Sequence, residues 1–143
     1  MRPKLLLRVS ALLVGIHLLG HAFGHFSWKD TQGDPKKEDV IRYMTDYKFD
    51  FMGAARSMGE YYEGYSDLIL IKYLVFVLLL WSISNFAEAH PNISRNLIAP
   101  LALGLVAFGI LEFVYFFPFA AIISMLAGMS ALFSMMMLKT KGN

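Results

Sequence analysis

Four long apolar runs constrain this chain more than any other feature of its sequence. They cover residues 5–26, 64–83, 97–117 and 118–138, and each is close to the roughly 20 residues that a helix needs to cross a bilayer. Hydrophobic residues make up 57% of the chain and charged residues only 17%, whereas soluble domains carry about 25% charged residues. The sequence therefore predicts an all-α integral membrane four-helix bundle that forms one transmembrane domain over residues 1–143.

Basic residues flank the first and last apolar runs and predict how the chain is oriented. Arg2, Lys4 and Arg8 lie at the start of the chain, and Lys139 and Lys141 follow the last run. Because positively charged flanks stay on the cytoplasmic side, we expect both termini in the cytoplasm. The net charge of +2 is too small and scattered to indicate nucleic-acid binding, and the absence of cysteine excludes disulfides and thiolate metal sites.

The segment 27–63 is mostly polar and is predicted to be an external loop. Within it, Asp34-Pro35 is typical of a helix start, with Asp34 as N-cap and Pro35 at the first helical position. One face of the helix that follows is marked by the apolar side chains of Val40, Met44 and Tyr47. We expect a short amphipathic helix at the membrane interface, between the first and second membrane helices.

Three histidines recur at intervals of four in the first apolar run, G-I-H-L-L-G-H-A-F-G-H-F. His17, His21 and His25 would lie within an arc of roughly 80° on a helix. Imidazoles are costly in hydrocarbon, so this stripe is expected to face protein, water or a ligand. Two imidazoles four residues apart are a common metal-ligand pair, which makes these histidines candidate ligands of a divalent metal such as zinc or non-haem iron.

A second polar pattern lies before and at the start of the second apolar run. On a helix it would form one stripe, made up of Gly53, Arg56, Ser57, Glu60, Gly64 and Asp67. A continuous helix from Phe49 to Ile83 would be roughly 52 Å long, beyond a hydrocarbon thickness of about 30 Å. We therefore expect a helix that either projects from the membrane or bends near Gly59 or Gly64. Close helix approach is expected at the small residues Gly20, Gly24, Gly53 and Gly64.

Ionisable residues of three segments are predicted to meet in the outer half of the bundle. Glu112 is the only acid between Leu97 and Leu138, and such a residue usually faces the bundle interior. It is expected to contact the first or second membrane helix. The candidate ligand-binding residues are Arg56, Ser57, Glu60, Asp67 and Glu112. We expect His21 to lie within direct or one-water reach of Arg56, Glu60 and Glu112, although each residue alone could serve only to tie helices together.

Three stretches resemble a family of small four-helix bacterial membrane proteins of uncharacterised activity, loosely DoxX-like. They are the histidine run, the stretch Y-K-F-D-F-M-G-A-A-R-S-M-G-E-Y-Y-E-G-Y and the stretch Y-F-F-P. The resemblance covers about Leu5 to Met137 and implies a multi-pass protein of the bacterial inner membrane. The positions that match its motifs are His17, His21, Gly53, Arg56, Ser57 and Gly64. It carries no activity to transfer, and likeness to proteins linked to quinone chemistry is an analogy of fold.

The sequence leaves three functions open. It does not distinguish an enzyme from a binding protein. The first is binding of a metal or small ligand by a polar His/Arg/Glu pocket in the outer half of the bundle. The second is binding of a hydrophobic molecule with a polar head, such as a quinone or lipid, whose head Arg56 would hold. The third is an accessory subunit that docks on a membrane-protein partner. Membrane lipids are expected partners in every case.

Overall fold

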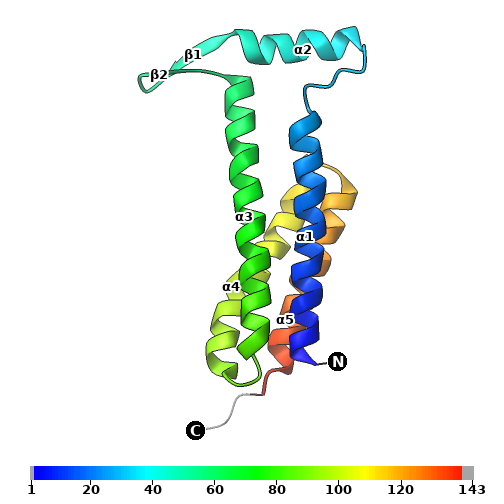
Figure 1. Ribbon diagram of the computed structural model, residues 1–143, viewed down its shortest axis with the longest axis vertical. Coiled ribbons are helices and arrows are strands. Elements are labelled where there is room, and N and C mark those ends of the chain that lie inside the picture. Colours follow the sequence, from blue (N-terminus) through cyan, green and yellow to red (C-terminus); the bar gives the residue numbers. More distant parts are fainter. Residues whose placement is uncertain (1, 140–143) are drawn as a thin grey trace. The chain divides into compact units, whose positions relative to one another are not determined.

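Helices make up most of the residues that the structure describes. The computed structural model describes residues 2–139. In chain order (Figure 1) it contains α1 (Pro3–Ser27), α2 (Pro35–Asp46), the strands β1 (Lys48–Phe51) and β2 (Ala54–Ser57), α3 (Met58–Phe86), α4 (Pro91–Tyr115) and α5 (Pro118–Met137). The two strands pair in antiparallel fashion and form a small hairpin.

Four of these helices, α1, α3, α4 and α5, are long and apolar enough to cross a membrane. They coincide with the four predicted runs, so the prediction of an all-α membrane four-helix bundle is confirmed. Their ends differ from the prediction, because α3 begins at Met58 and α4 at Pro91. With 29 residues, α3 is about 43 Å long, which exceeds the hydrocarbon thickness of about 30 Å. The helix α3 is therefore longer than a hydrocarbon layer is thick.

The short helix α2 starts where the sequence predicts. The carboxylate of Asp34 accepts a hydrogen bond of 3.0 Å from the backbone N–H of Lys36, and Pro35 is the first helical residue. This cap stabilises the first turn by supplying an acceptor that the helix itself lacks. Val40 and Tyr43 on α2, and Tyr47 at its C-terminal end, are exposed. The amphipathic segment between the first two membrane helices is thus confirmed.

Residues 48–57 form a β-hairpin, so the prediction that they continue a helical stripe is wrong. Gly53 and Met52 both have positive φ angles, 88° and 53°, at the turn between the strands. The carboxylate of Asp50 accepts a hydrogen bond of 2.8 Å from the Gly53 N–H and fixes this turn. Arg56 and Ser57 therefore lie on β2, and only the later members of the predicted stripe lie on α3.

The helix α3 begins at Met58 because two side chains cap its first turn. The Ser57 hydroxyl accepts from the Glu60 N–H at 3.1 Å, and the Glu60 carboxylate accepts from the Ser57 N–H at 2.7 Å. This reciprocal pair is a capping box. The helix α3 continues without a break through Gly59 and Gly64 (Figure 1), so the predicted alternative of a bend at these glycines is wrong.

The chain divides into two compact units, one of Leu19–Lys72 and one of Met1–Leu18 with Tyr73–Asn143. The second of these contains parts of all four long helices. Its α1 and α5 are joined by three serine hydroxyls that donate to backbone carbonyls of the other helix. These hydrogen bonds join the Ser10 hydroxyl to the Ala127 carbonyl oxygen (2.8 Å), the Ser130 hydroxyl to that of Leu6 (2.9 Å) and the Ser134 hydroxyl to that of Pro3 (2.8 Å). Such hydrogen bonds hold membrane helices together where the hydrophobic effect does not.

Two glycines allow α4 and α5 to pack closely as the last helical hairpin. A Cβ added at Gly128 would lie 2.8 Å from Val106 Cγ2 and 3.0 Å from the Val106 backbone nitrogen, and one at Gly109 would lie 2.5 Å from Met125 Cγ. The predicted close approach at the small residues Gly20, Gly24, Gly53 and Gly64 is wrong. A Cβ added at any of these four glycines would have no contact within 4 Å to the rest of residues 2–139, apart from the glycine's own helix and its chain neighbours.

Candidate functional site

A buried polar cluster takes one side chain from each of the four long helices. It consists of His17 on α1, Tyr73 on α3, Glu112 on α4 and Ser124 on α5, and we call it the four-helix cluster. The Ser124 hydroxyl lies 3.1 Å from His17 Nδ1, and His17 Nε2 lies 3.3 Å from the Tyr73 hydroxyl. Tyr73 donates to Glu112 Oε1 at 2.5 Å, and that oxygen is 3.6 Å from His17 Nε2. The cluster thus links all four helices through hydrogen bonds.

The Tyr73 hydroxyl lies at the centre of the four-helix cluster. It donates to Glu112 Oε1 and lies beside His17 Nε2, whose role as donor or acceptor depends on the imidazole tautomer. Glu112 is 9% exposed and contacts the first and second membrane helices, as predicted. Its second oxygen is buried without a hydrogen-bond partner in residues 2–139. A polar network of this kind holds the four helices in one arrangement.

The other two histidines of the stripe have different partners. His21 Nε2 lies 3.0 Å from the Ser66 hydroxyl and 3.3 Å from the Ser66 carbonyl oxygen, while His25 Nε2 lies 3.2 Å from Asp67 Oδ1. Within residues 2–139, no group of three or more His, Asp or Glu side chains has the arrangement of a metal site. The three predicted metal ligands are therefore distributed over three separate contacts.

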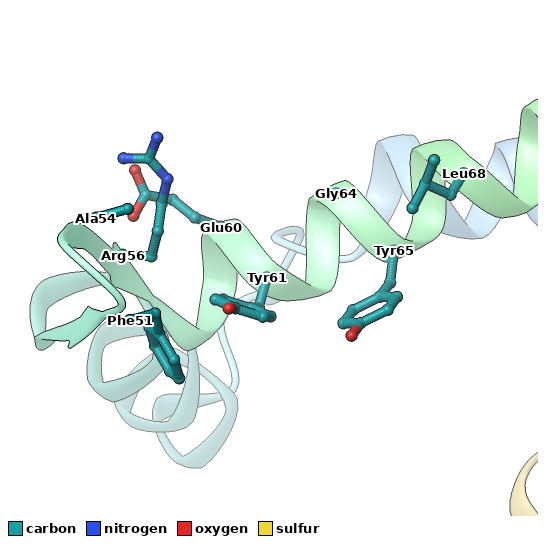
Figure 2. A pocket seen from close by; sticks show the side chains of 8 residues that line it. All are labelled: Phe51, Ala54, Arg56, Glu60, Tyr61, Gly64, Tyr65 and Leu68. Carbon is teal, nitrogen blue, oxygen red and sulfur yellow. The ribbon is translucent and has the colours of Figure 1, made fainter.

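An open groove lies between the β-hairpin and the first turns of α3. Its volume is about 400 Å³, and we call it the interfacial groove. It is lined by Phe51, Ala54, Arg56, Glu60, Tyr61, Gly64, Tyr65 and Leu68. Figure 2 shows these residues, three on the hairpin and five on α3. The predicted ligand-binding residues Arg56 and Glu60 both belong to it.

The register of the hairpin explains which strand residues face the groove. Phe51 pairs with Ala54, and Phe49 pairs with Arg56. Residues directly opposite on antiparallel strands share a face, and alternate residues of one strand share a face. Phe51, Ala54 and Arg56 therefore lie on one side of the hairpin, whereas Asp50 belongs to the other.

Aromatic rings form a row along the groove. The centroids of Phe51 and Tyr61 are 4.5 Å apart, and those of Tyr61 and Tyr65 are 6.0 Å apart. In Figure 2 these rings project to one side of α3, and Leu68 lies one turn further along the helix. Rings at these distances make a continuous apolar surface with hydroxyl groups at its edge.

The two charged side chains of the groove, Glu60 and Arg56, differ in their contacts within the protein. The Glu60 carboxylate caps α3 and lies 3.7 Å from Lys48 Nζ. The Arg56 guanidinium is exposed and donates to the carbonyl oxygen of Ala55 at 3.0 Å. None of the ion pairs within residues 2–139 includes Arg56. Several of its five N–H donors are therefore available to a ligand.

Two members of the four-helix cluster, Tyr73 and Ser124, were not predicted from the sequence. Both are polar groups within apolar spans, which is the available signal. Ser57 was predicted to bind a ligand, whereas it is 2% exposed and caps α3. Asp67, another candidate, pairs with His25.

Comparison with known proteins does not add a relative. No family model matches the chain, and no curated protein or solved structure matches it. The resemblance to DoxX-like proteins stays a prediction that rests on the sequence motifs alone.

Proposed function

We propose that this chain is a multi-pass protein of the bacterial inner membrane whose interfacial groove binds a small amphiphile. The basic residues near both ends, Arg2, Lys4, Arg8 and Lys139, support cytoplasmic termini. With α1 crossing outward, the segment between α1 and α3 then lies on the periplasmic side. The groove belongs to this segment and to the first turns of α3.

One observation carries the proposal, namely that the groove combines an aromatic row with a guanidinium that forms no ion pair within residues 2–139. The row of Phe51, Tyr61 and Tyr65 offers an apolar surface for the body of the ligand. Arg56 offers charged donors for a polar head. Ligand sites are mostly apolar, contain few polar groups and enclose about 300–1,000 Å³. The groove, at about 400 Å³, has these properties.

Quinones and single-chain lipids are the ligand classes that fit this chemistry, since both combine a hydrophobic body with a compact polar head. The groove supports a small ligand over a metal as its occupant, because its one carboxylate already caps α3. Metal binding by His17, His21 and His25 stays a prediction, as does association with a membrane-protein partner.

Filling the groove with a side chain tests the proposal. Gly64 lines the groove, and a Cβ added there meets no atom of residues 2–139 outside its own helix and neighbours within 4 Å. Gly64→Leu should therefore fold normally, with improved helix propensity, while its side chain occupies space that the ligand needs. Radiolabelled oleate and decylubiquinone serve as probes in a saturable binding assay on the detergent-purified protein. We expect at least a tenfold loss of affinity for the probe that the wild type binds.

Gly20→Leu is the matched control, because Gly20 lies in the same compact unit, on α1, and has equally open surroundings. This variant should bind the probe as the wild type does. Equal binding by both variants, or no saturable binding by the wild type, would contradict the proposed function.

A further inference from the structure

We propose that Arg8 on α1, together with Trp81 and Asn85 on α3, forms a binding site for the head of an anionic phospholipid with two acyl chains. These three residues belong to the compact unit of Met1–Leu18 with Tyr73–Asn143, whereas the interfacial groove belongs to the other unit. The lipid site and the interfacial groove therefore do not depend on each other.

The Arg8 side chain lies at the contact between α1 and α3. Its Nη2 donates to the side-chain oxygen of Asn85 at 3.4 Å, and its guanidinium carbon lies 4.8 Å from the centre of the Trp81 ring. Its Nε is buried and has no hydrogen-bond partner within residues 2–139. Arg8 is half-buried, and Trp81 and Asn85 beside it are exposed, so a ligand can reach the guanidinium from the protein surface.

The protein supplies no counter-ion for Arg8 within residues 2–139, because none of the ion pairs there includes this residue. A charge that is partly removed from water is costly unless an opposite charge lies nearby. Arg8 lies about 7.5 Å from the start of α1 at Pro3, and Trp81 lies at a similar distance from the end of α3 at Phe86. At the ends of membrane helices the anions at hand are lipid head groups, and a phosphate accepts paired hydrogen bonds from a guanidinium.

The end of this unit around Arg8 has an excess of positive charge. Its helix ends lie together (Figure 1), since Arg95 donates to the Leu138 carbonyl oxygen at 3.4 Å and Ser134 donates to that of Pro3 at 2.8 Å. Within residues 2–139, Glu88 is the one acid at this end, whereas the basic residues there are Arg2, Lys4, Arg8, Arg95 and Lys139. This excess favours a lipid head with a net negative charge over a zwitterionic head, whose cationic group it repels.

Two exposed apolar rows meet at Arg8, one on each helix. Residues three or four apart share a helix face. The exposed residues that share these faces are Leu5, Leu12 and Ile16 beside Arg8 on α1, and Leu74 and Leu78 beside Trp81 and Asn85 on α3. Because Arg8 contacts Trp81 and Asn85, the two rows lie side by side. Each row offers a surface for one acyl chain, which fits a lipid with two chains and its phosphodiester at Arg8.

Trp81 fluorescence reports lipid binding at this site, because brominated acyl chains quench a tryptophan that they contact. The chain has two tryptophans, so Trp28→Phe leaves Trp81 as the only one. This protein is reconstituted in mixed vesicles of phosphatidylglycerol and phosphatidylcholine, in which either lipid carries the bromines. One arginine near the membrane surface contributes about fivefold to the binding of an anionic lipid, so we expect about fivefold tighter association of phosphatidylglycerol. Equal association of the two lipids would overturn the proposal.

Two variants in the Trp28→Phe protein separate the site from the general charge of this end. Arg8→Gln should reduce the preference for phosphatidylglycerol to about twofold or less, because the charge beside Trp81 is removed. Arg2→Gln is the matched control, since Arg2 is exposed and precedes α1, so its loss leaves the contacts of Arg8 with Trp81 and Asn85. This control should keep most of the preference. An equal loss in both variants would show that the general charge selects the lipid and would overturn the site.

Two further outcomes would assign this surface to another partner. Glycerol phosphate, a soluble anion without acyl chains, should leave the quenching of Trp81 unchanged, and relief of the quenching would assign Arg8 to a soluble phosphate instead. Absence of quenching by either brominated lipid would show that a protein surface, such as a second copy of this chain, covers Trp81. Either result would overturn the lipid site.

Discussion

The four-helix cluster and the interfacial groove use the same residue types in opposite ways. In the cluster, a tyrosine, a histidine and a glutamate are buried and bonded to one another. In the groove, the half-buried Tyr61 and the exposed Tyr65 lie in a row in the same groove as Arg56, which forms no ion pair within residues 2–139. Polar groups that satisfy one another stabilise a fold, whereas polar groups left open at a surface are available to a ligand. This difference is the basis on which we propose packing for the cluster and ligand binding for the groove.

The largest expected difference in stability is between alanine variants of two tyrosines on α3, Tyr73 and Tyr65. Tyr73 is 2% exposed and bonded within the cluster, whereas Tyr65 is 63% exposed in the groove. Tyr73→Ala removes a buried ring and leaves Glu112 without its donor, so we expect destabilisation by about 3–5 kcal/mol. Tyr65→Ala should change stability by about 0.5 kcal/mol or less but weaken oleate binding. Denaturation in mixed micelles measures the first effect and the probe assay the second.

A similar loss of stability in both tyrosine variants would contradict the comparison. So would unchanged oleate binding in Tyr65→Ala, because the aromatic row would then make no contact with the ligand.

A smaller difference in stability is expected between alanine variants of two glycines, Gly128 and Gly20. A Cβ at Gly128 would lie 3.1 Å from the Ala102 carbonyl oxygen and 3.0 Å from the Val106 nitrogen, and backbone atoms cannot move aside. Gly128→Ala should therefore destabilise the helix pair α4 and α5 by about 1–3 kcal/mol. Gly20→Ala meets open space and should be neutral or stabilise α1 by up to about 1 kcal/mol. The same denaturation assay checks both, and equal effects would refute the close α4–α5 contact.

The helices were predictable because their signals are local. Apolar runs of sufficient length define α1, α3, α4 and α5, and Asp34-Pro35 defines the start of α2. The hairpin was not predicted, because four polar residues and two glycines also fit a helical stripe. The alternation K-F-D-F and the following Met52-Gly53 turn compete with that pattern, and the S-x-x-E box from Ser57 to Glu60 marks the true helix start.

The sites were predictable only in part, because the rotation of each helix depends on its neighbours. Glu112 could be identified because it is the one acid of the last two spans, and burial follows from its cost in hydrocarbon. Tyr73 and Ser124 are each one of several polar groups on their helices, so periodicity does not select them. Arg56 was identified by its charge. That aromatic residues line the same groove could not be predicted, because this depends on the hairpin fold.

Photo-crosslinking locates the ligand and so tests the central claim most directly. The purified protein is irradiated with an oleate analogue that carries a diazirine on its chain, and the labelled residues are identified by peptide mass spectrometry. We predict adducts within residues 51–68, suppressed by excess oleate and absent in Gly64→Leu. Labelling spread evenly over the apolar faces of α4 and α5, with no suppression by excess oleate, would show that the chain meets the probe only as bulk lipid and would contradict the account.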